Sequence, residues 1–369
     1  MASDVESRDR ELLERAILLG RQGWGRIHPN PMVGCILVRD GTVVAEGWHE
    51  EYGGSHAEAN ALAKAGELAK GATAYVSLEP CNHFGHTPPC SLALRDAGIS
   101  RLVYAAEDPG ARSAGGAQTL REAGVEVVGP VLSQEEARSE NPAFYFNVQQ
   151  NATFVAVKLA QTLDGRVARI PGERTAITGP EAQYETHRLR AGFDGIMVGS
   201  ETALVDDPLL TVREDVPVRS PPVRLLLDSR ARISPRARLF RDREEVPLVI
   251  FTAQDAPEPS VRELQKAGAL VHRVPQAGGR LCLEAVLDRC WQTGIRSIFC
   301  EGGPTLASSL LGGGYAHRLL LFLAPFVLGD SGVPTLPGRE FPHQWGTWYH
   351  AAPPQQFGGD ILLTLDRKI

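Results

Sequence analysis

The chain has 369 residues, of which 43% are hydrophobic and 22% are charged, and its formal net charge is −6 at pH 7. This length predicts two hydrophobic cores, and the composition excludes a disordered or fibrous protein. The acidic charge argues against nucleic-acid binding, and the lack of an apolar run of about 18 residues argues against a membrane span.

The first 150 residues predict a mixed α/β sandwich. A helix is expected from Arg8 to Gln22, followed by a hairpin whose strands, 33–39 and 42–48, flank Asp40-Gly41, a dipeptide typical of tight hairpin turns. Ser55 is expected to cap a helix over 56–68. Strands then alternate with helices, the strands at 72–78, 101–106 and 125–128 and the helices at 90–97 and up to about 123. Hairpin strands followed by such alternation favour an α/β/α sandwich with a mixed sheet.

A polar interval, 149–153, separates this part from a second alternating series, so we expect domains at 1–150 and 151–369. The predicted strands of the second domain are 154–160, 195–199, 223–228, 247–252, 297–301 and 318–324. Helices are expected at about 180–191, 258–267, 281–292 and 304–311. The second domain is therefore predicted to be α/β as well.

A metal-binding pattern lies in the first domain. His56-Ala57-Glu58 opens a predicted helix, and Pro80-Cys81 is followed by Cys90 at the start of the next helix, which is the H-x-E…P-C…C arrangement of zinc nucleobase deaminases. One imidazole and two thiolates leave a fourth position for water, which zinc makes nucleophilic at neutral pH. Glu58 would then carry protons from the water to the ring and the leaving ammonia.

Simpler interpretations of these residues remain open. The two cysteines could be buried beside an unrelated histidine, or His83 or His86 could supply a fourth ligand and close a structural zinc site. The six cysteines do not suggest a disulfide framework. The charged N-terminus does not resemble a secretion signal, so we expect a cytoplasmic protein.

Longer motifs identify a family. The chain reads His28-Pro29-Asn30-Pro31 before the first strand, and Leu78-Glu79-Pro80-Cys81-Asn82-His83 with Thr87-Pro88-Pro89-Cys90 around the two cysteines. The second domain carries Lys158-Leu159-Ala160, His187-Arg188-Leu189-Arg190, Asp206-Asp207-Pro208 and Glu301-Gly302-Gly303-Pro304-Thr305-Leu306. Over nearly its whole length the chain resembles the bifunctional deaminase–reductases of riboflavin biosynthesis, the RibD/RibG family.

The resemblance implies a cytidine-deaminase-like N-terminal domain and a dihydrofolate-reductase-like C-terminal domain. It implies two cofactors, Zn²⁺ and NADPH, and small-molecule pyrimidine ribosyl phosphates as substrates. The first step would deaminate 2,5-diamino-6-ribosylamino-4(3H)-pyrimidinone 5′-phosphate, and the second would reduce the ribosyl group of the product to ribityl. We also expect a homo-oligomer, a dimer or a tetramer, with neither nucleic acid nor membrane as a partner.

Site residues follow from the matching positions. The metal ligands would be His56, Cys81 and Cys90, and the catalytic residues Glu58, Lys158 and Asp206. The NADPH site would comprise Ala160, Ala176, Thr202, Asp206, Ser229, Gly302, Gly303, Pro304, Thr305 and Leu306. Substrate would be bound by Asn30, His49, His83, His86, Arg174, Arg190, Leu210, Arg213 and Glu301.

The chain departs from the family pattern at several positions. Asn82 replaces Ser, and His86 replaces a basic residue that would contact phosphate. Arg174 and Ala176 replace a small polar residue and the aromatic residue expected over the nicotinamide, and Val205 replaces Ala. Two alternatives therefore stay open, namely a deaminase with a silent second domain and a tRNA deaminase with a C-terminal binding module.

Overall fold

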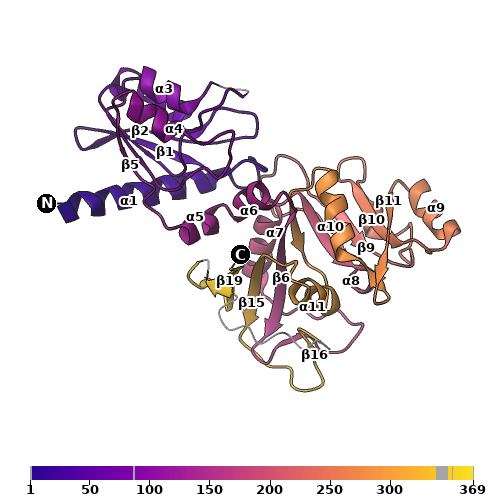
Figure 1. The fold of residues 1–369 in the computed structure, drawn as a ribbon. Helices are drawn as coiled ribbons and strands as arrows, with labels where there is room; N and C mark the ends of the chain where they lie inside the picture. The colour runs from indigo at the N-terminus through magenta and orange to yellow at the C-terminus, as the bar shows by residue number, and fades with distance from the viewer. Residues whose placement is uncertain (1, 86–87, 338–347, 351, 369) are drawn as a thin grey trace. The chain divides into compact units, whose positions relative to one another are not determined.

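A computed structural model of the chain describes residues 2–85, 88–337, 348–350 and 352–368. The chain divides into two compact units, Met1–Asn151 and Ala152–Ile369, each with its own sheet and core (Figure 1). The domain boundary expected from sequence falls next to this division. Among the described helices, none is long and apolar enough to cross a membrane.

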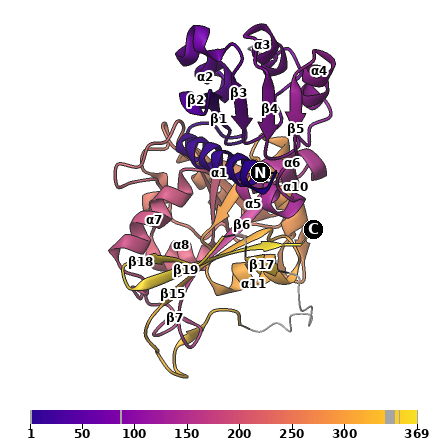
Figure 2. The same ribbon diagram turned by 90° about the vertical axis from the view of Figure 1, so that its left-hand side faces the viewer.

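Unit 1 contains a five-stranded mixed sheet of order β2-β1-β3-β4-β5, which can be followed from strand to strand in Figure 2. Its strands are β1 Gly34–Arg39, β2 Thr42–Trp48, β3 Thr73–Val76, β4 Arg101–Tyr104 and β5 Glu126–Val128. β1 is antiparallel to β2 and β3, whereas β3, β4 and β5 are parallel. Asp40 and Gly41 have φ of 49° and 77°, so both turn residues take the left-handed conformation that this dipeptide favours.

Helices cover both faces of the unit 1 sheet. The helices are α1 Ala2–Gly20, α2 Ala57–Ala65, α3 Cys90–Asp96, α4 Gly116–Glu122, α5 Gln134–Glu140 and α6 Pro142–Gln150, with 3₁₀ turns at Arg21–Gly23 and Gly66–Ala69. Along β1, Cys35 and Leu37 pack with α2, α3 and α4, while Ile36 and Val38 pack with α1. This alternation explains why residues 35–38 of β1 are all apolar, since both faces of the strand are buried there.

Close packing of α1 on β1 depends on a glycine. A Cβ atom added at Gly34 would lie 2.0 Å from the Ala16 carbonyl oxygen, so the helix and strand could not approach this closely with any larger residue.

Unit 2 contains a large sheet of order β11-β10-β9-β8-β14-β6-β15-β19-β17, with β18 also paired to β19. The strands are β6 Phe154–Thr162, β8 Gly195–Gly199, β9 Val223–Leu227, β10 Leu248–Ala253, β11 Leu270–Val274, β14 Ser297–Cys300, β15 Arg318–Ala324, β17 Trp348–His350, β18 Gln355–Phe357 and β19 Asp360–Arg367. Two small ribbons pair β7 Arg166–Ala168 with β16 Val333–Pro334 and β12 Gln276–Ala277 with β13 Arg280–Leu281. From β11 to β15 all neighbours are parallel, and β19 is antiparallel to β15.

Two helical layers bury the parallel strands of unit 2. The helices are α7 Pro180–Arg190, α8 Ser200–Asp206, α9 Glu258–Lys266, α10 Leu283–Gln292 and α11 Pro304–Gly312, with a 3₁₀ turn at Arg238–Phe240. Met197 on β8 belongs to a core that includes α10 and α11, whereas its neighbours Ile196 and Val198 belong to a core that includes α8 and α9. Because the strands from β11 to β15 are parallel, their carboxyl ends meet at one edge of the sheet, where loops carry polar side chains.

The structure corrects several sequence expectations. His56, not Ser55, is the N-cap residue of α2, and no side chain caps this helix. The first helix was expected from Arg8 to Gln22, but it begins at Ala2 and gives way to a 3₁₀ turn at Arg21. Helices α5, α6 and α8 were not expected. The start of α5 could have been predicted, because Ser133 and Glu136 form a capping box there, a pattern that is visible in the sequence.

Candidate active sites

The first candidate site is a cluster of His56, Cys81 and Cys90. The His56 Nδ1 atom lies 3.5 Å from Cys81 Sγ and 3.3 Å from Cys90 Sγ, and the three ligand atoms all lie within 4.8 Å of one another. A tetrahedral zinc with ordinary bond lengths separates nitrogen and sulfur ligands by about 3.6 Å. The spacing and the donor types therefore fit one zinc ion, and within the described part of the chain no fourth His, Cys, Asp or Glu joins the group.

Electrostatics in this cluster favour a bound cation. Hydrogen bonding from Cys90, together with the His56 ring and the Cys90 backbone N–H, holds the pKa of Cys81 well below its usual value. Zinc binds the thiolate form, so this thiol is prepared for the metal. Glu58 is 3% exposed, and burial beside Cys81 raises the pKa of its carboxyl to about 7, despite the opposing effect of His56. A carboxyl with this pKa accepts and releases protons near neutral pH.

A polar wall of the first site contains Asn30 and His49. The His49 ring lies 5.5 Å from that of His56, edge to face. His49 Nδ1 lies 3.0 Å from the Ser55 carbonyl oxygen and donates to it, so His49 Nε2 accepts from the Asn30 amide at 3.1 Å. His83 has a buried Nδ1 atom with no hydrogen-bond partner among the described residues, which leaves it available to a ligand. His86 lies outside the described residues.

Two residues without an assigned role hold the loop that carries Cys81. Glu79 accepts the backbone N–H groups of Gly115 and Ala117, both at 3.1 Å, and Asn82 accepts the Ser91 hydroxyl at 2.8 Å and the Thr119 hydroxyl at 3.2 Å. Asn82 is the departure from the family's Ser, and its longer side chain reaches both α3 and α4. Nothing local in the sequence indicates these contacts, because the partners lie up to 38 residues away.

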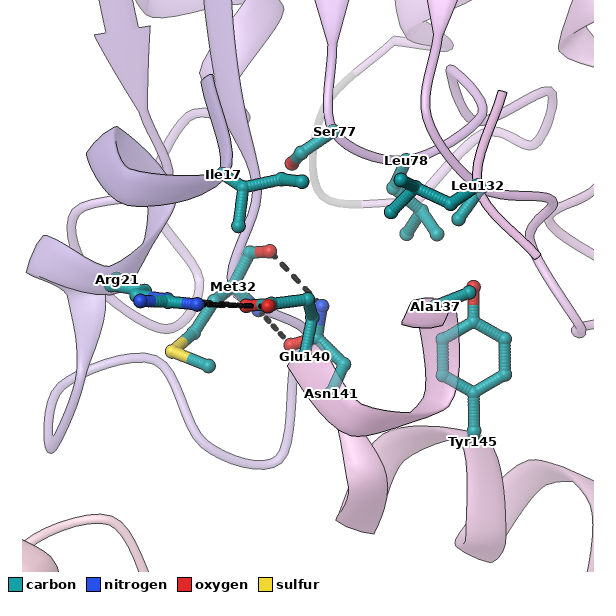
Figure 3. A pocket seen from close by; sticks show the side chains of 11 residues that line it. Ile17, Arg21, Met32, Ser77, Leu78, Leu132, Ala137, Glu140, Asn141 and Tyr145 are labelled. Atoms are coloured by element: carbon teal, nitrogen blue, oxygen red, sulfur yellow. Dashed lines mark hydrogen bonds and ion pairs between the residues drawn. The ribbon is translucent and has the colours of Figure 1, made fainter. Parts of the chain in front are cut away.

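A cavity in unit 1 is too small to bind a substrate. Its volume is about 10 Å³, room for about one water molecule. Figure 3 shows that α5 closes it, where Glu140 pairs with Arg21 at 2.8 Å and Asn141 exchanges hydrogen bonds with the Met32 backbone. None of the three metal-binding side chains lines it.

The second candidate site lies at the carboxyl edge of the unit 2 sheet. Glu301, just after β14, accepts from Arg190 of α7, with Nη2 to Oε2 at 2.8 Å. Their side chains are only 14% and 10% exposed. Burial lowers the pKa of Lys158 on β6, and the negative charge of Glu301 partly opposes this effect. Burial would raise the pKa of Glu301, but the positive charges of Arg190 and Lys158 hold it below its usual value. Three expected residues are therefore brought into one charged cluster.

Two further expected residues, Leu210 and Arg213, lie on the loop after α8. Leu210 is 3% exposed and has a φ of 49°, an unusual conformation for a residue other than glycine. The loop is joined to the charged cluster, since Arg190 donates to the Thr211 carbonyl at 2.9 Å. Arg213 reaches the cluster through His187, a residue to which the sequence analysis gave no role.

The expected NADPH residues lie on neighbouring segments. Thr202 in α8 accepts the backbone N–H of Gly303 at 2.9 Å, which joins the Gly302-Gly303 turn to this helix. A Cβ atom at Gly303 would lie 2.9 Å from the Thr202 hydroxyl, so glycine permits the approach. Pro304, Thr305 and Leu306 form the first turn of α11, and Ala160 lies on β6. Ser229 follows β9. It lies next in sequence to a cavity of about 420 Å³ that is lined by residues 230–235 and by α9. Ala176 lies in an exposed stretch between β7 and α7.

Arg174, the second departure, is near Asp206. Burial raises the pKa of Asp206 above its usual value, and the positive charge of Arg174 opposes this effect. The exposed Arg174 is therefore close enough to the carboxylate to influence its charge.

Comparison with known proteins assigns a family to each unit. Residues 6–106 match the cytidine and deoxycytidylate deaminase zinc-binding region, and residues 153–362 match the RibD C-terminal domain. The riboflavin biosynthesis protein RibD of Escherichia coli is 39% identical over 348 residues, covering 90% of this chain and 92% of that protein. RibD of Haemophilus influenzae is 36% identical, with 99% of each chain covered.

Solved structures agree with these relatives. RibD of Acinetobacter baumannii has a TM-score of 0.83 at 32% identity, covering 99% of this chain and 100% of that one. A Thermotoga maritima protein described as a diaminohydroxyphosphoribosylaminopyrimidine deaminase/5-amino-6-(5-phosphoribosylamino)uracil reductase has a TM-score of 0.82 at 29% identity, covering 98% and 99%. The chain belongs to the RibD family and is a bifunctional deaminase and reductase of riboflavin biosynthesis that uses zinc and NADPH.

Proposed function

We propose that residues 1–150 deaminate 2,5-diamino-6-ribosylamino-4(3H)-pyrimidinone 5′-phosphate and that residues 151–369 reduce the product, 5-amino-6-(5-phosphoribosylamino)uracil. The observation that carries the first half is the His56, Cys81 and Cys90 cluster with the buried Glu58 beside it. The observation that supports the second half is the Lys158, Arg190 and Glu301 cluster. The name of the Thermotoga maritima protein, a diaminohydroxyphosphoribosylaminopyrimidine deaminase and 5-amino-6-(5-phosphoribosylamino)uracil reductase, supports this choice of substrates.

In the deamination, His56, Cys81 and Cys90 hold zinc, which when bound makes water nucleophilic at neutral pH. Glu58 would take one proton from the attacking water and deliver it to the ring nitrogen. It would then carry the proton of the added hydroxyl group to the exocyclic amine, which leaves as ammonia as the carbonyl forms. Asn30, His49 and His83 bind the pyrimidine, with Asn30 fixed by its contact to His49. His86 is a further candidate ligand of the ribosyl phosphate, as its place in the motif implies.

In the reduction, NADPH would supply the hydride that the ribosyl C1′ carbon of the open imine form accepts, and the former ring oxygen would become a hydroxyl group. Lys158 and Asp206 supply or stabilise the proton at the developing amine and hydroxyl. Arg190, Leu210, Arg213, Glu301 and Arg174 bind the ribosyl phosphate substrate. The residues that would hold the cofactor are Ala160, Ala176, Thr202, Asp206, Ser229 and the 302–306 turn.

A coupled assay with the zinc-loaded protein tests both steps. Ammonia release should depend on the diaminopyrimidinone phosphate, and NADPH consumption should follow. Glu58→Ala should remove ammonia release while leaving reduction of added 5-amino-6-(5-phosphoribosylamino)uracil intact, and Lys158→Ala should do the reverse.

The alternatives give different results in the same assay. Ammonia release without any NADPH consumption would mean that the second domain has no reductase activity. The replacements at Arg174 and Ala176 are the reason for considering this alternative. Turnover on tRNA alone would exclude the riboflavin substrate. We further propose a cytoplasmic homo-oligomer, dimer or tetramer, which light scattering of the purified protein tests.

A further inference from the structure

Asn141 joins two helices of unit 1, and its side chain does not stabilise either of them. It follows the last residue of α5 and is the N-cap residue of α6, yet no side-chain hydrogen bond caps α6. Asparagine is a preferred N-cap residue because its side-chain oxygen can accept a backbone N–H of the first helical turn. At Asn141 this oxygen is directed elsewhere, so α6 gives up a stabilising contact.

The side chain of Asn141 binds the backbone of Met32. Its Oδ1 atom accepts the Met32 N–H at 2.7 Å, and its Nδ2 group donates to the Met32 carbonyl oxygen at 3.2 Å. Figure 3 shows the amide group directed at this residue. One side chain therefore satisfies both backbone polar groups of a residue that lies 109 positions away in the sequence.

Met32 lies in the short segment that connects Asn30 to β1. Before it, the Asn30 N–H closes a turn at 3.0 Å with the carbonyl oxygen three residues earlier. Pro31 has no N–H group and offers no backbone donor that could fix this segment. Asn141 therefore restrains the middle of the segment through both polar groups of Met32.

The same segment sets the position of two expected pyrimidine ligands relative to each other. Asn30 Nδ2 lies 3.1 Å from His49 Nε2, and the His49 backbone N–H donates to the Val33 carbonyl oxygen at 3.0 Å. A shift of the backbone at Met32 would thus move Asn30 relative to His49. Misplacement of a binding group by about 1 Å can cost about 100-fold in rate.

The residue before Asn141 makes a different contact. Glu140 pairs with Arg21 at 2.8 Å, and these side chains are 26% and 51% exposed. This pair attaches the end of α5 to the 3₁₀ turn at Arg21–Gly23, whereas Asn141 attaches it to the segment that carries Asn30. The two neighbouring residues therefore separate attachment of the helix from control of that segment.

We propose that Asn141 is a positioning residue of the deaminase site, which holds Asn30 in its pyrimidine-binding position through the backbone of Met32. This inference rests on the proposed deaminase function and on the substrate contact proposed for Asn30. It extends the deaminase site to the helical segment that follows the sheet of unit 1.

The central variant is Asn141→Ser. Serine is a preferred N-cap residue and can cap α6 itself, but its single hydroxyl group cannot reproduce both contacts with Met32. We expect the KM for 2,5-diamino-6-ribosylamino-4(3H)-pyrimidinone 5′-phosphate, measured by ammonia release from the zinc-loaded protein, to rise about tenfold, the size of one lost hydrogen bond. The kcat should change little. The zinc content and the rate of reduction of added 5-amino-6-(5-phosphoribosylamino)uracil should equal those of the wild type.

Two further proteins show whether the effect passes through Asn30. Glu140→Gln breaks the neighbouring pair with Arg21 and should leave the KM unchanged. Asn30→Ala removes the side chain that Asn141 positions, so Asn30→Ala/Asn141→Ser should have the same KM as Asn30→Ala alone. A wild-type KM in Asn141→Ser, an equal rise in Glu140→Gln, or losses that multiply in the double variant would each overturn the proposal.

A second replacement covers a failure of Asn141→Ser to fold. Asn141→Asp keeps an acceptor for the Met32 N–H but removes the donor to the Met32 carbonyl oxygen. It should also raise the KM, and the rise should again disappear in the Asn30→Ala background. A rise that persists there would overturn the proposal.

Failure of the proposed deaminase function has a different signature in the same experiments. A wild-type protein that releases no ammonia from the diaminopyrimidinone phosphate would contradict that function. Normal turnover by the wild type with an unchanged KM in Asn30→Ala would leave the function standing and would contradict the role of Asn30, and with it the role of Asn141.

Discussion

The two sites are assembled in different ways. In unit 1, the three candidate metal ligands come from residues 56 to 90, on two helix starts and one loop, and their donor atoms lie within 4.8 Å of one another, a spacing that fits one cation. In unit 2, Lys158, Arg190 and Glu301 come from distant strands and a helix, and their charges compensate one another. The first site is therefore completed by a metal, and the second is held together by the protein's own ion pair.

Loss of the metal should separate the sites most clearly. Cys90→Ser replaces a thiolate with a hydroxyl that binds zinc poorly. We expect loss of zinc and deamination at the background rate, measured by metal analysis and ammonia release. Reduction of added 5-amino-6-(5-phosphoribosylamino)uracil should stay at the wild-type rate. Retention of both zinc and deamination would show that Cys90 is not a ligand.

Loss of one charge should affect only the second site. Glu301→Gln leaves the buried Arg190 without a counter-ion, and such a change costs about 3 kcal/mol of stability. We expect this loss in denaturant unfolding of unit 2, together with loss of reduction but not deamination. Glu258→Gln is the matched control, because Glu258 pairs with Arg262 and Arg273 at the surface and its side chain is 56% exposed. A loss in this control as large as that of Glu301→Gln would contradict the role of burial, because exposed ion pairs contribute little to stability.

Acid should destabilise unit 2 through a partly buried histidine. Burial lowers the pKa of His317 to about 3, and its Nδ1 accepts the Val155 N–H at 2.9 Å. Between pH 6.5 and 3 the unfolded chain binds a proton at this residue and the folded chain does not, so stability falls as pH falls, by up to about 1.4 kcal/mol per pH unit. His317→Asn keeps an acceptor but does not titrate. Unfolding free energies measured from pH 7 to pH 4 should therefore fall less steeply in the variant, and equal slopes would contradict the assignment.

The smallest expected effect concerns the cofactor turn. Thr202→Val removes the acceptor for the Gly303 N–H and should weaken NADPH binding about fivefold, which corresponds to one neutral hydrogen bond of about 1 kcal/mol. Thr202→Ser keeps the hydroxyl and should bind NADPH like the wild type. Both dissociation constants can be measured by calorimetry, and equal weakening in the two variants would indicate a packing effect of the lost methyl group instead.

Local features were the most predictable. The hairpin at Asp40-Gly41, the strands of unit 1, the strands from β6 to β15 other than β7 and β11 to β13, and the candidate zinc donors all follow from short patterns, because turn conformation, strand periodicity and ligand chemistry are properties of neighbouring residues. The strands β11, β17, β18 and β19 of the unit 2 sheet were missed. The helix start at His56 was less predictable, since Ser55 has the side chain of a cap but the backbone begins the helix one residue later. Helix α8 was missed because its seven residues give too short a periodic pattern.

Contacts between distant residues were not predictable. Asn82 looked like an unexplained departure until its contacts with Ser91 and Thr119 were visible, and His187 was only part of a motif until both of its nitrogens were seen facing Arg213.

The sequence by itself determined the two-part α/β organisation, the donor set for zinc and the glycine turn for a dinucleotide, since each depends on residue types at short, fixed spacing. Only the tertiary structure decided which charges pair, because Arg190 and Glu301 are separated by 111 residues and meet through the order of the strands. The same order brings α7 against the loop after α8, so that Arg190 and Arg213 both contact His187.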